Sequence, residues 1–305
     1  MKIIFLGTPE FSVPSLDILY QAGYQIPAVI TSPDRRGGRG RNKIIQSAIK
    51  KYALAKGIKV LQPTNLKSPK FNAELKSLQA ELQIVVAFRM LPEAVWDMPP
   101  LGTYNLHGSL LPQYRGAAPI NWSIINGDKE TGVTSFKLKH EIDTGSLLLQ
   151  QKIPIYNFDN AGDLHDRMKW IAADTVLESV KIIESGQINL IPQDNSKVSH
   201  APKLTSNNTQ INFQDKAENI INLVRGLAPY PGAWMELDGK ITKIFECHQP
   251  KENSQLEPGK LKTDGQHYIH IGCKDGCISI QHLQMSGKKA MKVANFLNGY
   301  KLLKT

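Results

Sequence analysis

The chain has 305 residues, of which 41% are hydrophobic and 21% charged, a composition that is typical of soluble globular proteins and excludes disorder as the main state. Its apolar runs are much shorter than the ~20 residues of a membrane-spanning helix, and the apolar stretch after Lys2 is too short for a signal peptide. Three cysteines are too few for a disulfide framework and indicate a cytoplasmic protein, while a formal net charge of +10 favours polyanionic partners.

The first part of the chain alternates between strand-like and helix-like segments. Apolar runs predict strands at 2–6, 25–31, 83–87, 102–106, 133–139 and 146–153. Apolar side chains at helical spacing predict helices at 10–21, 45–56, 69–79, 117–126 and 161–185. This order predicts an α/β fold, with a doubly wound, Rossmann-like parallel sheet that is covered by helices on both faces.

The second part of the chain has a different pattern. From 190 to 209 the periodicity fades and Pro, Ser, Asn and Asp dominate, which predicts a linker between a domain at 1–189 and a domain at 210–305. In the later domain, Asp215 is expected to cap a short helix. Period-two alternation predicts strands at 233–237, 241–248, 268–273 and 277–283, with Asp-Gly turn signals between them. We expect a small, OB-like β-barrel.

Sequence signatures of nucleotide and metal sites are incomplete. The turn from Gly7 to Phe11 stands where a dinucleotide fingerprint would be, but it lacks the second and third glycines. The Ser-Gly-Lys-Lys run at 286–289 lacks the upstream Gly and the following Ser or Thr of a phosphate-binding loop. A metal-like cluster spans a predicted strand and turn, where alternation keeps its side chains apart, so no metal is expected. Its members are His267, His270, Cys273 and Cys277.

Candidate catalytic side chains lie at the end of a predicted strand. Alternation places Asn105 and His107 on one side of this strand, at the edge where open α/β sheets bind ligands. An amide and an imidazole at this place can address one carbonyl oxygen. Asp143, in a turn between two later strands, is suited to orient or charge the imidazole. A structural interpretation stays open here, because a strand-end His commonly bonds a backbone group and an Asp before Thr-Gly commonly forms a turn.

Three ordered segments resemble the 10-formyltetrahydrofolate-dependent formyltransferases. They are the turn from Gly7 to Phe11, the run from Asn105 to Pro112 with Arg115 to Pro119 after it, and Asp143-Thr144-Gly145. The resemblance implies that Asn105, His107 and Asp143 are catalytic and that 10-formyltetrahydrofolate is the formyl donor. It also implies a folate-binding signature, which consists of Ser109, Leu110, Leu111 and Pro112.

Other segments resemble the members of this family that act on initiator methionyl-tRNA. They are the basic loop 32–41, the run 200–204, Arg225-Gly226-Leu227 with 229–233, and Gly287-Lys288-Lys289, so the resemblance covers nearly the whole chain. Two positions depart from the family pattern. Phe88-Arg89 stand where many members carry Tyr-Gly, and Glu141-Ile142, beside His140, stand where they carry Gly and an aliphatic residue.

Two basic segments are candidates for contact with RNA. Five cations of the loop are expected to bind tRNA phosphates, namely Arg35, Arg36, Arg39, Arg41 and Lys43. Near the C-terminus a second basic face is expected from Lys288, Lys289, Lys292, Lys301 and Lys304. A run of like charges is also common on solvated surfaces that bind nothing, and this interpretation stays open.

Together the composition and the family resemblance imply a cytoplasmic, monomeric transferase without a metal or membrane contact. It is expected to move the formyl group of 10-formyltetrahydrofolate to the amino group of initiator methionyl-tRNA, for translation initiation. Asn105 and a protonated His107 are expected to stabilise the tetrahedral intermediate. A sugar-nucleotide N-formyltransferase is the nearest alternative, because it shares the fold and the trio. A hydrolase that deformylates the folate and a non-catalytic RNA-binding protein are further alternatives.

Overall fold

The computed structural model of this protein describes residues 1–37, 43–250 and 255–302. The chain divides into two units. The first consists of Met1–Gly116, Thr131–Ile153 and His165–His200, and the second of Ala117–Glu130, Pro154–Leu164 and Ala201–Thr305. Each unit is built around a β-sheet of its own. No described helix is long and apolar enough to cross a membrane.

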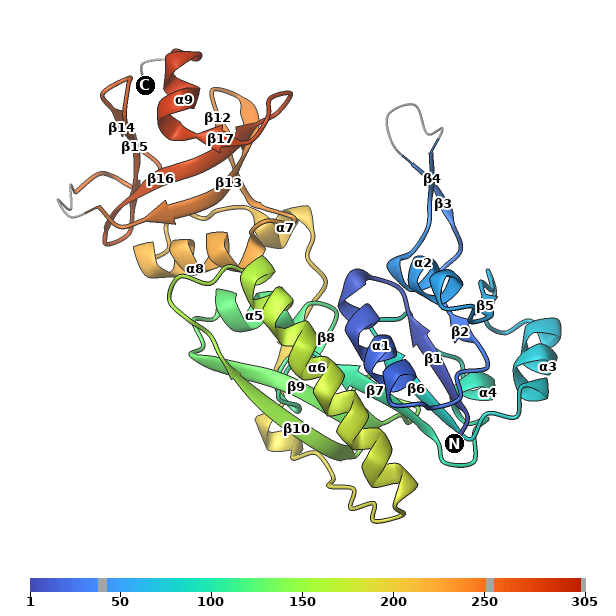
Figure 1. The fold of residues 1–305 in the computed structure, drawn as a ribbon. Coiled ribbons are helices and arrows are strands. Elements are labelled where there is room, and N and C mark those ends of the chain that lie inside the picture. Colours follow the sequence, from blue (N-terminus) through green and yellow to red (C-terminus); the bar gives the residue numbers. More distant parts are fainter. Residues whose placement is uncertain (38–42, 251–254, 303–305) are drawn as a thin grey trace. The chain divides into compact units, whose positions relative to one another are not determined.

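A mixed seven-stranded sheet forms the centre of the first unit, in the order β10-β9-β7-β6-β1-β2-β5 (Figure 1). Its strands are β1 (Ile3–Gly7), β2 (Val29–Ile30), β5 (Val60–Leu61), β6 (Leu82–Val86), β7 (Thr103–His107), β9 (Glu130–Lys137) and β10 (Leu147–Pro154). The five strands from β7 to β5 run parallel, whereas β9 runs antiparallel to β7. The predicted parallel sheet is therefore confirmed for these five strands. Two further strands, β9 and β10, extend it beyond β7.

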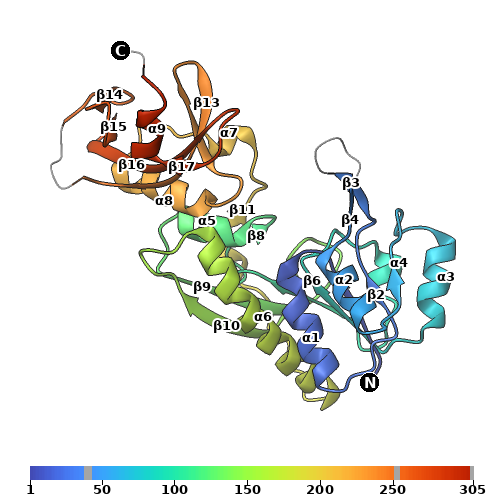
Figure 2. The ribbon, with the colours of Figure 1, turned by 45° about the horizontal axis from the view of Figure 1, so that its top comes forward.

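Helices cover both faces of this sheet. One face carries α1 (Val13–Gln21), which follows a 3-10 turn at Glu10–Ser12, together with α2 (Ala48–Ala55) and α6 (Ala161–Glu184). Both ribbon views place α1 beside α6 (Figures 1 and 2). The other face carries α3 (Pro69–Ser77) and α4 (Glu93–Trp96), where Leu6 of β1 packs with Leu75 and Val95. All side chains of β1 and β6 are buried, which confirms the predicted doubly wound arrangement.

The strand order creates a switch point between β1 and β6, because the chain builds the sheet outward from β1 in one direction and then from β6 in the other. Parallel sheets of this kind bind ligands beyond the carboxyl ends of the strands at the switch point. There, Gly7 ends β1 in a turn so tight that a Cβ would lie 2.8 Å from the Oγ of Ser12. Ala87, directly after β6, has a φ of 50°. The carboxyl end of β7, which carries His107, lies at the same edge.

A curled antiparallel sheet forms the second unit, in the order β12-β13-β16-β15-β14, with β17 paired to β16. Its strands are β12 (Ala233–Leu237), β13 (Lys240–His248), β14 (Leu261–Thr263), β15 (Ile269–Cys273), β16 (Gly276–Met285) and β17 (Met291–Lys292). Irregular pairing of β13 with β16 near Glu246 bends the sheet, as bulges do. The four predicted strands are confirmed within two residues at each end, and the sheet curls into a half-barrel.

Two helices pack on this sheet and close its core. Val224 and Leu227 of α8 (Ala217–Leu227) and Phe296 of α9 (Val293–Asn298) are buried in one cluster with side chains of the strands. The prediction that Asp215 caps α8 is wrong. The first free amide, that of Ala217, donates to the Oδ1 of Asp275 at 2.7 Å, so the cap comes from the turn between β15 and β16.

Short elements connect these parts. They are β3 (Arg35–Gly37), β4 (Lys43–Ile45), β8 (Arg115–Gly116), α5 (Pro119–Ile125), a 3-10 turn at Asn195–Lys197, β11 (His200–Ala201) and α7 (Ser206–Thr209). Helix α2 begins at Ala48, later than predicted, because the Oγ of Ser47 accepts from the Lys50 amide and Ile45 pairs in a hairpin. The stretch 190–200 belongs to the first unit and is hydrogen-bonded within it, for example through the two backbone hydrogen bonds that Ile191 and Leu147 exchange.

Candidate active site

Strand β7 presents Asn105 and His107 at its carboxyl end. Two residues apart on a strand, they lie on one face of it. The strand is fixed from both sides, since Asn105 lies opposite Val85 of β6 and opposite Phe136 of β9. His107 is buried, with 6% of its surface exposed, and Asn105 is half-buried. The sheet therefore holds both side chains at the edge where the fold class binds ligands.

The imidazole of His107 has one nitrogen engaged and one facing an acid. Its Nε2 lies 2.8 Å from the carbonyl oxygen of Tyr114. A carbonyl oxygen only accepts hydrogen bonds, so Nε2 carries a hydrogen and donates it. Its Nδ1 lies 3.8 Å from the Oδ2 of Asp143, within ion-pair range but beyond hydrogen-bond distance. Nδ1 is therefore the nitrogen that is left for a substrate.

Asp143 stands in the turn between β9 and β10 with a left-handed backbone, at a φ of 54°. Its Oδ2 accepts from the backbone N–H of Gly116 at 2.9 Å. Its carbonyl oxygen accepts from the Nε2 of Gln193 at 2.9 Å, and the same Nε2 donates to the carbonyl of Gly145 at 2.8 Å. A Cβ on Gly145 would lie 1.7 Å from the carbonyl oxygen of Lys137, so the turn requires glycine there. Asp143 is therefore held both at its side-chain carboxylate and at its backbone carbonyl.

The side-chain amide of Asn105 has no hydrogen-bond partner among the residues that the structure describes. Its two N–H donors are free to serve a bound oxygen. The structure thus brings together three of the predicted residues, Asn105 with an unpaired amide, His107 with its Nδ1 toward Asp143, and Asp143 with a fixed carboxylate.

The predicted folate signature forms a loop that is hydrogen-bonded to β9 and β10. The Oγ1 of Thr134 donates to the carbonyl of Ser109 at 2.6 Å and accepts from the Leu111 N–H at 3.0 Å. Gln150 donates to the Leu111 carbonyl at 2.9 Å. Ser109 and Leu111 are buried at 0% and 3% exposure, while Leu110 and Pro112 are half-buried. Ser109 and Leu111 therefore shape the loop, and Leu110 and Pro112 present its surface.

The two departures from the family pattern have different surroundings. The guanidinium of Arg89 donates to the carbonyl oxygens of Pro63 and Thr64, the latter at 3.2 Å, and so braces the loop after β5. His140 and Glu141 are exposed at the start of the Asp143 turn. The Glu141 carbonyl accepts from the hydroxyl of Thr144 at 3.0 Å, which supports the turn.

The basic loop is a hairpin of β3 and β4. Arg36 lies opposite Ile44 in this hairpin, and Arg35, Arg36 and Lys43 are exposed. Arg39 and Arg41 lie outside the described residues. At the base, Asp34 pairs with Lys50 at 2.6 Å, and this hydrogen bond lowers the pKa of the Asp34 carboxyl. The pair fixes the base of the hairpin, and Arg35, Arg36 and Lys43 face solvent.

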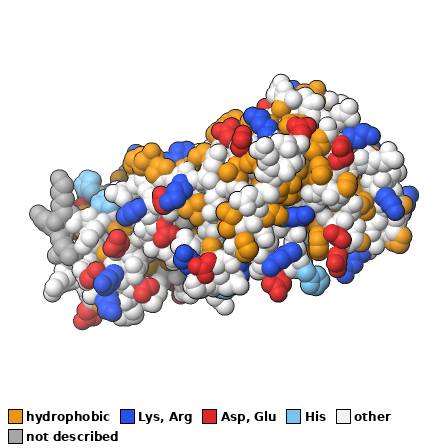
Figure 3. All heavy atoms as spheres, turned by 90° about the horizontal axis from the view of Figure 1, so that it is seen from below, with side chains coloured by type: hydrophobic (Ala, Val, Ile, Leu, Met, Phe, Trp, Pro, Cys, Tyr) orange, Lys and Arg blue, Asp and Glu red, His pale blue; other side chains and the backbone are white. Residues whose placement is uncertain are grey.

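The cations of the C-terminal segment are on the surface of the second unit. Lys289, Lys292 and Lys301 are exposed, and Lys304 lies outside the described residues. The ammonium of Lys288 lies 4.9 Å from the ring centre of Tyr300, so part of its charge is engaged with an aromatic face. On the face drawn in Figure 3, basic and acidic side chains are interspersed, so the positive surplus is not concentrated there.

The residues of the metal-like cluster have other surroundings. His267 Nδ1 lies 2.8 Å from the Oδ2 of Asp264, while Cys273 and Cys277 are buried thiols. In the described ranges, no three His, Cys, Asp or Glu side chains are grouped so as to hold a metal ion.

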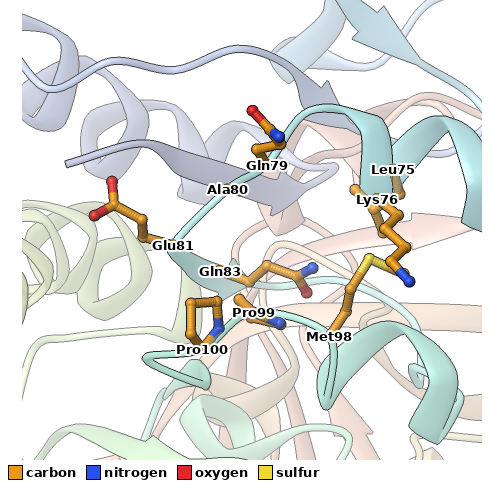
Figure 4. Close-up of a pocket in the computed structure, with 9 residues that line it drawn as sticks. All are labelled: Leu75, Lys76, Gln79, Ala80, Glu81, Gln83, Met98, Pro99 and Pro100. Carbon is orange, nitrogen blue, oxygen red and sulfur yellow. The ribbon is translucent and has the colours of Figure 1, made fainter.

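A cavity of about 280 Å³ lies away from the candidate catalytic side chains, near the amino ends of β6 and β7 (Figure 4). Leu75 and Lys76 of α3, Gln83 of β6 and Met98 line it. This cavity therefore lies at the opposite edge of the sheet from the candidate site. Parallel sheets of this kind bind ligands at the carboxyl ends of their strands, not at this edge.

Residues 1–180 match the family described as formyl transferase, and residues 203–301 match its C-terminal domain. The chain is 46% identical to methionyl-tRNA formyltransferase of Parabacteroides distasonis, over 99% of this chain and 96% of that protein. It is 50% identical to methionyl-tRNA formyltransferase of Flavobacterium johnsoniae, over 98% and 96%. The chain belongs to the methionyl-tRNA formyltransferase family.

Solved structures share the fold of this methionyl-tRNA formyltransferase family member at low sequence identity. WlaRD, a sugar 3N-formyl transferase solved with dTDP and 5-N-formyl-THF, has a TM-score of 0.70 at 21% identity and covers 95% of this chain and 99% of that one. HypX from Aquifex aeolicus, in complex with tetrahydrofolic acid, has a TM-score of 0.68 at 20% identity and covers 97% of this chain and 47% of that one. These likenesses confirm the two-unit formyltransferase fold.

Sequence reasoning missed two participants of the site. Tyr114 contributes only its backbone carbonyl, which no side-chain pattern can indicate. Gln193 lies in the segment that was interpreted as a linker from its composition, so its contact with Asp143 had no sequence signal.

Proposed function

We propose that this chain transfers the formyl group of 10-formyltetrahydrofolate to the α-amino group of initiator methionyl-tRNA, giving N-formylmethionyl-tRNA for translation initiation. The family membership supports the reaction, with relatives of that name 46% and 50% identical over nearly the full length. The arrangement of Asn105, His107 and Asp143 at the carboxyl edge of the sheet supports the assignment of the reaction to these three residues. That arrangement is the observation on which the proposed mechanism rests.

The amide and the imidazole serve the developing oxyanion. The amino nitrogen attacks the formyl carbon, a new C–N bond forms, and the carbonyl oxygen becomes negatively charged in a tetrahedral intermediate. The free Nδ2 of Asn105 and a proton on Nδ1 of His107 are the two donors for this oxygen. Since Nε2 is committed to Tyr114, the ring cannot turn away without losing that hydrogen bond.

The carboxylate serves the charge on the imidazole and the movement of a proton. Asp143 stabilises a positive charge on His107 through its own negative charge. When the intermediate collapses, the bond from the formyl carbon to the folate nitrogen breaks. The attacking nitrogen loses one proton and the leaving folate nitrogen gains one, and Asp143 relays this proton, directly or through water.

The two parts of the chain are assigned different tasks. The catalytic domain is 1–189, the linker is 190–209, and the domain at 210–305, an OB-like barrel, binds tRNA together with the hairpin cations Arg35, Arg36, Arg39, Arg41 and Lys43. Ser109, Leu110, Leu111 and Pro112 form the folate-binding loop. The enzyme is a cytoplasmic monomer and has no membrane contact. Exposed cations of the hairpin and of the C-terminal segment support RNA as the partner, because phosphate contacts dominate nucleic-acid affinity.

The test is a turnover assay with three acceptors. The full chain is supplied with 10-formyltetrahydrofolate and with methionylated initiator tRNA, methionylated elongator tRNA or a dTDP-amino sugar. We expect turnover of the initiator, much slower turnover of the elongator and none of the sugar. Turnover of the sugar alone would replace the proposal by the sugar-nucleotide alternative. Equal rates on both tRNAs would remove the initiator specificity.

A further inference from the structure

We propose that Gln193 is a positioning residue for Asp143. Its side-chain amide fixes the turn at 143–145 and thereby sets where the Asp143 carboxylate stands relative to His107. This inference rests on the proposed function, because it takes the role of Asp143 in formyl transfer as given. All residues in the argument belong to the first unit.

The amide of Gln193 uses its entire hydrogen-bonding capacity. Its Nε2 donates to the carbonyl oxygens of Asp143 at 2.9 Å and Gly145 at 2.8 Å. Its Oε1 accepts from the Nε and Nη2 of Arg115 at 3.0 and 2.7 Å. A primary amide has two donor hydrogens and two acceptor lone pairs, so all four are occupied. The orientation is unambiguous, because carbonyls only accept and a guanidinium only donates.

Arg115 closes this contact into a ring of hydrogen bonds. The residue after it, Gly116, donates its N–H to the Asp143 carboxylate at 2.9 Å. Gln193 therefore holds the backbone of Asp143 while Gly116 holds its side chain, and Arg115 joins the two holders. Arg115 is itself anchored, since its backbone N–H donates to the Ser199 carbonyl at 2.9 Å. A further contact of its Nη2, with the exposed Asn195 at 3.0 Å, lies outside this ring.

Asp143 needs such support because of its backbone conformation. Asp tolerates a left-handed backbone better than most residues, but a φ of 54° is still less favourable than an extended or helical one, so contacts that hold the turn stabilise it. Asp143 Oδ2 and His107 Nδ1 are 3.8 Å apart, so there is no hydrogen bond between them that would resist a displacement of the turn. The interaction between the two charges depends directly on this separation. Loss of the Gln193 amide is therefore expected to reach the imidazole through Asp143.

A purely structural role, in which Gln193 attaches the segment 190–200 to the sheet, is less consistent with the contacts. Ile191 already exchanges two backbone hydrogen bonds with Leu147, at 2.8 and 2.9 Å. Ser199 is joined to Arg115 through its carbonyl and to the Tyr114 N–H through its hydroxyl. The segment is thus fixed on both sides of Gln193 without it.

Three single variants test the proposal. Gln193→Met keeps the length of the side chain and removes every hydrogen bond. Gln193→Glu keeps the acceptor for Arg115 but turns an oxygen toward the two carbonyls. Asn195→Ala is the matched control, because it removes another acceptor of the same guanidinium without touching the turn. We expect both Gln193 variants to lower kcat by about 10-fold or more, as loss of groups that orient active-site ligands commonly does, and Asn195→Ala to leave kcat unchanged.

Two readouts separate positioning from a general loss of structure. The KM for 10-formyltetrahydrofolate is expected to stay constant in Gln193→Met while kcat falls. In a double variant, Gln193→Met is expected to add less than about a 2-fold further loss to Asp143→Asn, because both act through one carboxylate.

A third readout does not depend on turnover. The N–H of Gly116 donates to the Asp143 carboxylate, so its hydrogen exchange, followed by NMR, reports whether that carboxylate is in place. Faster exchange at Gly116 is expected in both Gln193 variants and not in Asn195→Ala. Unchanged Gly116 exchange in Gln193→Met, or losses that multiply with Asp143→Asn, would overturn the proposal. If the wild type fails to formylate methionyl-tRNA, the proposed function fails, and Gly116 exchange still decides the role of Gln193.

Discussion

The imidazole of His107 donates its Nε2 hydrogen to the carbonyl oxygen of Tyr114, 2.8 Å away, and this contact turns Nδ1 toward Asp143. Tyr114 has a φ of 59°, a left-handed backbone conformation. Residues other than Gly, Asn and Asp adopt it only where the surrounding structure stabilises it. The backbone of the loop after the proposed folate signature therefore determines which nitrogen of His107 faces Asp143.

The two oxyanion donors are tested by removing each one. Asn105→Ala and His107→Ala are each expected to lower kcat by on the order of 100-fold or more, because each removes a donor to the oxygen of the intermediate. Thermal unfolding and binding of the formyl donor are expected to stay close to those of the wild type. Near-normal turnover in either variant would remove that residue from the mechanism.

The charge of Asp143 is tested without changing its size. Asp143→Asn is expected to have a severely lowered kcat, because the variant keeps the size of the side chain and loses the negative charge that lies 3.8 Å from the His107 Nδ1. Turnover close to that of the wild type would show that the charge of Asp143 has no role in the reaction.

The fold and part of this site could be predicted from the sequence because they depend on local periodicity. Alternation along one strand is enough to place Asn105 and His107 on one face, and Thr-Gly after Asp143 is enough to indicate a turn. The remaining contacts join residues far apart in the chain. Asp275 caps a helix that begins 58 residues earlier, and Gln193 reaches Asp143 across 50 residues. Neither segment has a periodicity that points to its partner.

The loop of the folate signature is tested through its support. Thr134→Val removes the hydroxyl that serves Ser109, Leu111 and Gln150, and leaves buried polar groups without partners. We expect a loss of stability of about 1–3 kcal/mol and an increased KM for 10-formyltetrahydrofolate. Thr175→Val is the control, because the buried hydroxyl of Thr175 donates within α6 to the carbonyl of Ile171, and no other contact of this hydroxyl is found among the described residues. A comparable increase in KM in the control would show that the effect is not local to the loop.

The cysteines are expected to be chemically inert in the folded protein. Cys247, Cys273 and Cys277 are buried, and burial raises the pKa of the Cys247 thiol to about 12. A thiol with a raised pKa stays protonated at pH 8, and the protonated form is not the nucleophile. Alkylation by iodoacetamide at pH 8 is expected to be slow in the native chain and complete in denaturant, with turnover unchanged after native treatment. Rapid native labelling with loss of activity would contradict this expectation.

The cations of the β3–β4 hairpin are tested by neutralising the three that the structure describes as exposed, Arg35, Arg36 and Lys43, to Gln. The KM for methionyl-tRNA is expected to rise while the KM for 10-formyltetrahydrofolate stays constant, because the hairpin is proposed to contact phosphate. The slope of log affinity for tRNA against log salt is expected to become less steep by about 0.9 for each lost contact on a duplex stem.

The control neutralises Lys67, Lys70 and Lys76, which are also exposed and which lie in or just before α3, so the net charge falls by the same amount. Equal effects of the two triple variants would assign the tRNA affinity to net charge alone. A hairpin variant with the salt slope and KM of the wild type would identify these cations as a solvated surface. The main argument from this loop against the sugar-nucleotide alternative would then be lost.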